Sequence, residues 1–153
     1  MANVWNEAKL QLFLSTLDME NDAMRLMLFT TSPAVMTDAQ KDLTTVADVL
    51  SDSAFTEATD ASYTGQGANG RITLTGVNAQ RDDVQNQAEF FADEPTWTAL
   101  DNDLLRSAMI LKFSVNDAGS TPVCLYPFVG AQQTNGGDVT LLFPITIGFL
   151  TLL

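Results

Sequence analysis

The sequence predicts a mainly β protein in which antiparallel strands form a sandwich or barrel, with one or two short helices attached. Three observations lead to this fold class. Apolar and polar residues alternate with period two through most of the chain after residue 70. Turn-forming Asn, Asp, Gly and Pro residues recur at short intervals in the same region. Helical spacing is confined to the region before residue 51, and a length of 153 residues fits a single β-rich domain over 1–153.

The segment TDAQKDLTTVADVL, residues 37–50, predicts one helix. Thr37 and Gln40 have the spacing of a capping box, in which each side chain binds the other residue's backbone N–H. Apolar residues would then share one helical face: Ala39, Leu43, Val46, Ala47 and Leu50.

The N-terminal segment, residues 3–17, fits two structures. Trp5, Ala8 and Leu12 have helical spacing after Asn3, a candidate N-cap, whereas Leu10, Leu12 and Leu14 alternate as in a strand. We favour a short helix within residues 1–20, or an N-terminal arm formed by the same residues.

Strands are predicted at 23–31, 71–82, 87–93, 106–116 and 121–130. The first should be a central strand covered on both faces, with Met24, Leu26 and Leu28 on one side and Met27 and Phe29 on the other. Two polar segments, NDAGSTP at 116–122 and TNGGD at 134–138, are predicted to connect hairpins.

The last segment, residues 139–153, contains no charged residue. It is shorter than the roughly 20 residues of a membrane-spanning helix, and Pro144 and Gly148 interrupt it. Its apolar residues at odd positions would lie on one face of a strand. We therefore expect a terminal core strand with an unpaired edge near Pro144, and no membrane insertion.

Composition narrows the function classes. The chain has no His and one Cys, so a Ser-His-Asp site, a Cys-His site and a structural zinc site cannot be built. The net charge of −12 makes nucleic acid an unexpected partner. Cys124 lies in an apolar stretch and is interpreted as a buried hydrophobic residue. The N-terminus has neither a basic region nor a continuous apolar region, which favours folding in a reducing cytoplasm.

The stretch YTGQGANGR, residues 63–71, contains a G-x-G-x-x-G pattern at Gly65, Gly67 and Gly70. In a dinucleotide-binding fold a buried strand precedes this pattern and a helix follows it. Here the preceding residues are polar and acidic, and the following residues alternate, with Ile72 and Leu74 apolar. We interpret the loop as a glycine-rich connection into a strand and assign no nucleotide cofactor.

Asp18, Glu20 and Asp22 have the alternate spacing that begins an EF-hand loop. Position six of that loop would be Ala23 and position twelve Phe29, in place of Gly and Glu. These acids are therefore interpreted as solvated turn residues, and no metal ligand is assigned.

Aromatic and acidic residues offer a weaker hypothesis of carbohydrate binding or hydrolysis. Trp97, Tyr63 and Tyr126 could stack on a sugar ring beside the acids of 92–97 and of 101–103. Core or rim packing is the favoured interpretation of these aromatic residues. No catalytic, cofactor-binding or metal-binding residue is assigned, and the protein is not expected to be an enzyme.

From Tyr63 onward the chain resembles a family of small structural proteins of tailed-bacteriophage virions, including head-decoration proteins. The resemblance rests on YTGQGANGRITLTG, QRDDVQNQAEFFADEPTW, SAMILKF, the TP before a strand and IGFLTLL, together with NEAKLQLF and MRLMLFTTS near the N-terminus. The glycine loop is longer than in the family, and the N-terminal segment is less regular.

The resemblance implies a capsid decoration, or cement, protein that binds the major capsid protein and stabilises the head shell. Such a protein would be made in the host cytoplasm and located on the capsid surface of the virion. A homotrimer is expected, in which residues 1–20 of one copy reach a neighbour. The alternatives are a tail-associated or baseplate structural protein and a carbohydrate-binding module.

Overall fold

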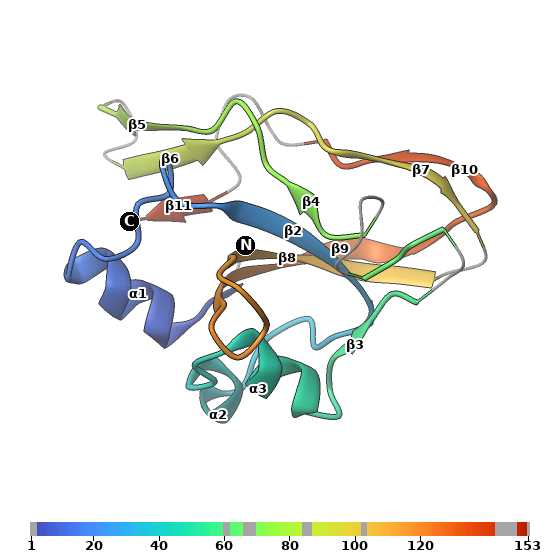
Figure 1. The fold of residues 1–153 in the computed structure, drawn as a ribbon, viewed down its shortest axis with the longest axis horizontal. Coiled ribbons are helices and arrows are strands. Elements are labelled where there is room, and N and C mark those ends of the chain that lie inside the picture. Colours follow the sequence, from blue (N-terminus) through green and yellow to red (C-terminus); the bar gives the residue numbers. More distant parts are fainter. Residues whose placement is uncertain are drawn as a thin grey trace.

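The computed structural model describes residues 3–59, 62–65, 70–83, 87–101, 104–142 and 150–152 (Figure 1). Within them, β-strands far outnumber helical segments, and every paired strand is antiparallel. The predicted mainly β fold with short helices is confirmed. The strands form three separate sheets and no closed barrel.

The largest sheet has the strand order β1-β9-β8-β2-β3, and β4 pairs with β2 beside β3. Its long strands are β2 (Met24–Thr31), β8 (Leu104–Lys112) and β9 (Thr121–Gln133). Its short strands are β1 (Asn3–Val4), β3 (Thr56–Glu57) and β4 (Ile72–Thr73). The turn at 116–122 lies between β8 and β9, which pair with each other, so this predicted hairpin connection is confirmed.

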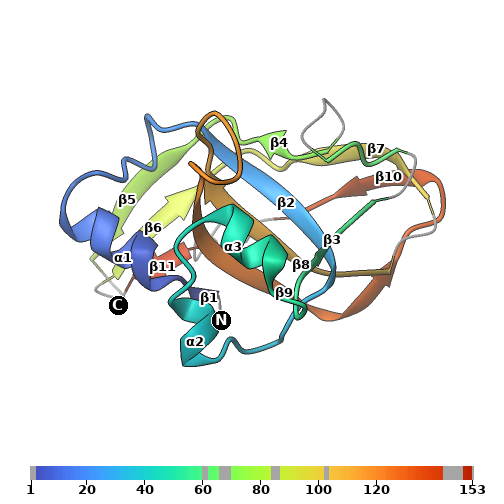
Figure 2. The same ribbon diagram turned by 60° about the horizontal axis from the view of Figure 1, so that its bottom comes forward.

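Two small sheets cover one face of the large sheet, and helices α2 (Asp38–Lys41) and α3 (Val46–Ser51) lie on the other side (Figures 1 and 2). One small sheet contains β5 (Asn78–Asp82), β6 (Gln87–Phe91) and β11 (Leu150–Leu152). The other pairs β7 (Thr96–Leu100) with β10 (Gly137–Thr140). This layered arrangement leaves the central strands without a solvent-facing side.

Strand β2 divides the core into two apolar clusters, as its alternation predicts. Met24, Leu26 and Leu28 pack with Phe90 and Trp97 beneath the small sheets. On the opposite face, Met27 and Phe29 pack in the second cluster with residues that include Val46, Val49 and Phe55. β2 is therefore the central strand covered on both faces.

The prediction of one helix over 37–50 is wrong, because the segment forms two short helices, α2 (Asp38–Lys41) and α3 (Val46–Ser51). The capping box of Thr37 and Gln40 is present, but a second one forms between Thr45 and Asp48. Thr45 is extended, with φ −124° and ψ 159°, so it begins a new helix instead of continuing the first. Together with α1 the described residues form three helices, one more than the expected maximum, and Ala39 is exposed.

Helix α1 (Asn6–Phe13) confirms the short N-terminal helix and not the alternating strand. Asn3 is not its cap, because Asn3 lies in β1 opposite Leu125. Trp5 takes the N-cap position without a side-chain capping bond, and its burial with Ala8 fixes α1 on the large sheet.

Three strand predictions fail because the sequence pattern does not reveal which strands pair. The segment 139–153 is not one strand: β10 ends at Thr140 in one sheet, whereas β11 belongs to another. The expected unpaired edge at Pro144 lies outside the described residues.

The segment TNGGD, predicted to connect a hairpin, joins β9 to β10. These two strands do not pair with each other, since β10 pairs with β7, so the segment connects no hairpin. The strand predicted at 71–82 is divided into β4 and β5 by the turn at Gly76, whose φ is +59°.

A buried ion-pair network holds the edge of the large sheet. The Arg71 guanidinium donates from Nε to Glu57 Oε1 at 2.8 Å and from Nη2 to Glu57 Oε2 at 2.6 Å. Its Nη1 donates to Asp117 Oδ1, in the turn between β8 and β9. Tyr63 extends the network, because its hydroxyl donates to Glu57 Oε1 at 3.0 Å and accepts from the Leu28 N–H.

The electrostatics of this network favour the charged arginine. Burial alone would lower the pKa of Arg71, but its hydrogen bonds to Glu57 and Asp117 outweigh burial and raise that pKa. Burial, together with the charge of Glu57, raises the pKa of Tyr63 and keeps its phenol protonated. Arg71 and Thr73 alternate with the apolar Ile72 and Leu74 in the sequence, a pattern that favours an exposed Arg71. The side chain is instead buried, because two carboxylates compensate the guanidinium inside the protein.

Replacing Arg71 with Met should lower the free energy of unfolding by about 3 kcal/mol, because Glu57 and Asp117 would keep partly buried charges without their cation. Arg106→Met is the matched control, since Arg106 is exposed, and it should change stability by less than about 0.5 kcal/mol. Urea unfolding followed by Trp fluorescence measures both variants. Equal stability of the two variants would contradict the structural role of Arg71.

Candidate functional site

The described residues of the glycine loop form a structural connection that leads into β4. Gly65 has a φ of +57°, and β4 begins after Gly70, as expected for a loop that enters a strand. The Arg71 N–H donates to Gly65 O at 2.7 Å, and the Trp97 indole N–H donates to Gly70 O at 2.6 Å. The described ends of the loop therefore hold each other and cap a core tryptophan, while Gly67 lies outside the described residues.

The three acids at 18–22 serve a turn, as predicted. Asp18 accepts hydrogen bonds from Asn21 and from the Glu20 N–H, and the bond from the Asn21 side chain lowers the pKa of Asp18. Asp22 pairs with Lys112 at 2.8 Å, while Glu20 accepts the N–H of Ala79. Across the described residues, no three metal-ligating side chains gather into a site.

The structure buries two of the three aromatic residues proposed to stack on sugars. Trp97 and Tyr63 lie in the core, and only Tyr126 remains partly accessible. Of the acids nearby, Asp93 accepts a hydrogen bond from Thr75 beside the turn at Gly76, and Asp103 lies outside the described residues. Trp97, the main aromatic residue of the carbohydrate hypothesis, is therefore not accessible to a sugar ring.

Cys124 is fully buried in β9, as predicted. Burial raises the pKa of its thiol to about 12, so the reactive thiolate is scarce near neutral pH. The residue packs as a hydrophobic side chain in the first core cluster.

The outer part of β9 presents an open strand edge. β1 pairs with β9 only at Cys124 and Leu125. Beyond them, no other described strand pairs with residues 127–132 on the side opposite β8. We call residues 127–132 the β9 edge. Its sequence neighbourhood is unusual, because residues 118–137 contain no Asp, Glu, Lys or Arg although the chain carries a net charge of −12.

A bulge shapes the β9 edge. Leu105 is opposite Gln132 and Ser107 is opposite Pro127, so Arg106 alone faces residues 128–131. Gly130 has a φ of +78°, and the Gln132 amide donates to the carbonyls of Val129 and Gly130. The bulge leaves the Val129 side chain fully exposed.

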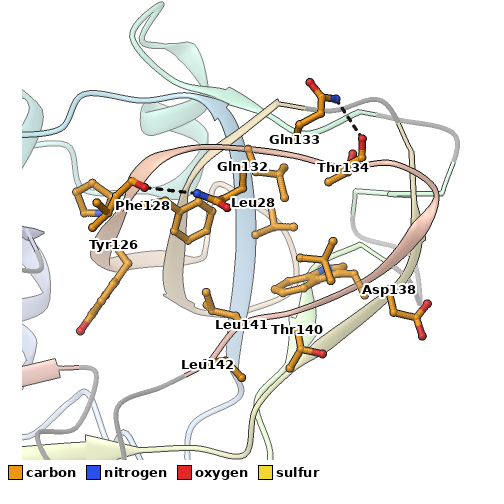
Figure 3. Close-up of a pocket in the computed structure, with 15 residues that line it drawn as sticks. Leu28, Tyr126, Phe128, Gln132, Gln133, Thr134, Asp138, Thr140, Leu141 and Leu142 are labelled. Carbon is orange, nitrogen blue, oxygen red and sulfur yellow. Dashed lines mark hydrogen bonds between the residues drawn. The ribbon is translucent and has the colours of Figure 1, made fainter.

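A half-open groove of about 800 Å³ lies between the outer part of β9 and β10 (Figure 3). Buried Leu28, Trp97 and Leu105 contribute to its lining. The remaining lining residues are Tyr126, Pro127, Phe128, Val129, Gln132, Gln133, Thr134, Asp138, Val139, Thr140, Leu141 and Leu142. Asp138 is the one charged residue among them.

The sequence analysis missed both surfaces. The uncharged run at 118–137 was a visible signal for the β9 edge, whereas the groove depends on β10 pairing with β7, which no local pattern reveals. Comparison of the chain with protein-family models, curated proteins and solved structures finds no match. No helix in the described part of the chain is long and apolar enough to span a membrane.

Alanine substitutions should separate two roles in the glycine loop. A Cβ on Gly70 would lie 1.8 Å from Gly65 O, so Gly70→Ala should cost about 2 to 3 kcal/mol of stability by forcing the loop apart. A Cβ on Gly65 has open space, and Gly65→Ala should cost only about 1 kcal/mol through its positive φ. Thermal or urea unfolding of both variants tests this order, and a larger loss for Gly65→Ala would contradict it.

Cys124 should resist alkylation in the folded protein. Because burial raises the pKa of the Cys124 thiol to about 12, iodoacetamide at pH 8 should label Cys124 only after the chain unfolds. Mass spectrometry with and without urea measures the labelled fraction. Rapid labelling of native protein would contradict this prediction and show that β9 opens locally around Cys124.

Proposed function

We propose that this chain is a capsid decoration protein that binds the major capsid protein on the outside of a bacteriophage head. The observation that carries the proposal is the β9 edge, an open and uncharged strand edge on a strongly acidic protein. Monomeric proteins usually protect such edges with charge, proline, a bulge or a covering segment, and the β9 edge has Pro127 and a bulge but no charge. The resemblance of the sequence to small virion proteins supports the same role.

The attachment would occur by strand addition. An extended segment of the capsid protein would pair its backbone with residues 127–132 and continue the large sheet by one strand. The bulge places Val129 where it can pack on the partner, and Arg106, exposed on the neighbouring strand, offers a cation close to this edge. Expansion of the shell would then have to break these contacts before it could separate the subunits.

The charge distribution favours binding to protein. The uncharged run at 118–137 lets another surface approach without the repulsion that a net charge of −12 produces elsewhere. The sequence supplies no His and one buried Cys, which suits a structural role better than a catalytic one. A homotrimer would match a local three-fold position of the shell and add avidity to a weak contact.

Virus particles produced by the genome that encodes the chain provide the direct test. Mass spectrometry should detect the chain in purified particles, and electron microscopy should place its density on the outer head shell. Density confined to the tail would instead support the tail-associated alternative, and absence from the particle would overturn a virion role.

Ala131→Lys should weaken binding to undecorated heads at least about tenfold, because a lysine in the middle of an open edge opposes strand pairing. Val115→Lys places the same charge at another exposed position, in the turn after β8, and is the matched control that should bind as the wild type does. Co-sedimentation with heads measures both variants. Unchanged binding by Ala131→Lys would exclude the β9 edge as the attachment surface.

A further inference from the structure

Helix α1 carries an exposed apolar ridge. Leu10, Phe13 and Leu14 are 51%, 91% and 61% exposed. They lie at i, i+3 and i+4 and therefore share one side of the helix. We call these three residues the α1 ridge. Three large apolar side chains that meet on one surface are typical of an interaction site.

The contacts of α1 with the rest of the protein leave the α1 ridge exposed to solvent. Ala8 is buried against the first core cluster, and Leu12 packs beside it on the same face. The Gln11 amide donates to Thr121 Oγ1 in β9, and the Asn6 amide donates to Asp42 at 2.7 Å. These contacts fix the rotation of α1, so the ridge cannot turn inward without breaking them.

The groove offers a matching apolar surface at the far end of the molecule. Its walls include Phe128, Leu141 and Leu142, and Leu142 is 70% exposed. Figures 1 and 2 both place α1 at one end of the long axis and the β7–β10 ribbon at the other. The ridge of one molecule therefore lies far from its own groove and is free to enter the groove of another.

Charge favours a second copy of this chain as the occupant. Lys9 precedes Phe13 by four residues, so it stands on the ridge side of α1. It is exposed and forms no ion pair within the described residues, since its Nζ donates to Asn6 Oδ1. The groove carries the opposite charge, because exposed Asp138 is the one charged side chain among the described residues that line it. The two surfaces thus complement each other on a chain whose net charge is −12.

We propose that the α1 ridge of one copy docks in the β9–β10 groove of the next copy. The contact is head to tail, because it joins two different surfaces of the same protein. Contacts of this kind form a closed ring when the rotation between copies closes, and a filament when it does not. The proposal does not depend on the capsid role, since it concerns contacts between copies of this chain alone.

Light scattering of the purified full chain, from low to high micromolar concentration, tests the docking. The wild type should associate with rising concentration, whereas Phe13→Glu and Leu142→Glu should each weaken association at least tenfold. Val115→Glu makes the same charge change at a side chain that is 87% exposed, outside both surfaces, and should associate as the wild type does. All three positions are exposed, so the variants should keep the wild-type unfolding temperature.

Mixing the two defective variants identifies a head-to-tail contact. Phe13→Glu retains an intact groove and Leu142→Glu retains an intact ridge, so the mixture should form a dimer with one copy of each and grow no further. A wild type that stays monomeric, association that Phe13→Glu does not weaken, or a mixture that forms no dimer would each overturn the proposal. Ala131→Lys should still self-associate, because Ala131 does not line the groove, so this proposal and the capsid proposal fail separately.

Discussion

The ion pairs of Arg71 are the interaction on which the edge of the large sheet depends. Glu57 and Asp117 lie 14 and 46 positions away in the sequence, so one guanidinium joins β3, the start of β4 and the turn between β8 and β9. β3 and β4 are two-residue strands that offer little backbone pairing of their own. The network supplies directional contacts where the ladder is short, and Tyr63 links it to the backbone of β2. Removing one partner of such a network leaves the other charges buried, which makes the arrangement cooperative.

Sequence reasoning succeeded where one local pattern decides the structure. The continuous apolar run at 26–29 predicted that β2 is covered on both faces, because successive residues of a strand point to opposite faces of the sheet. The capping box of Thr37 was also visible, since its two partners are three residues apart. The same locality explains the failed helix over 37–50. Thr45 and Asp48 form a competing cap inside the apolar pattern, and a capping residue must leave helical geometry to bind the N–H groups that follow it.

Failures occurred where the outcome depends on partners distant in the sequence. Arg71 alternates with apolar neighbours in the sequence, as an exposed residue would. It is buried because the fold brings Glu57 and Asp117 to its guanidinium. Residues 139–153 have the composition of one strand, yet β10 and β11 join different sheets because β7 and β6 are their partners. The groove follows from that division, since β10 leaves β9 to pair with β7. Only the uncharged run at 118–137 was available as a local signal for the candidate surfaces.

The three candidate surfaces lie outside the faces that close the core. Among the described residues, the central part of the large sheet is covered on two faces. Contacts with other proteins must then use edges and ends, and the described residues offer an open β9 edge, a groove beside it and a ridge on α1. On a chain with a net charge of −12, association is least opposed by repulsion where charge is sparse. In the two proposals the edge would bind through backbone groups, whereas the ridge and groove would bind through side chains. Pro127, Phe128, Val129 and Gln132 of the β9 edge also line the groove, so a capsid segment and a neighbouring copy would compete for this part of β9.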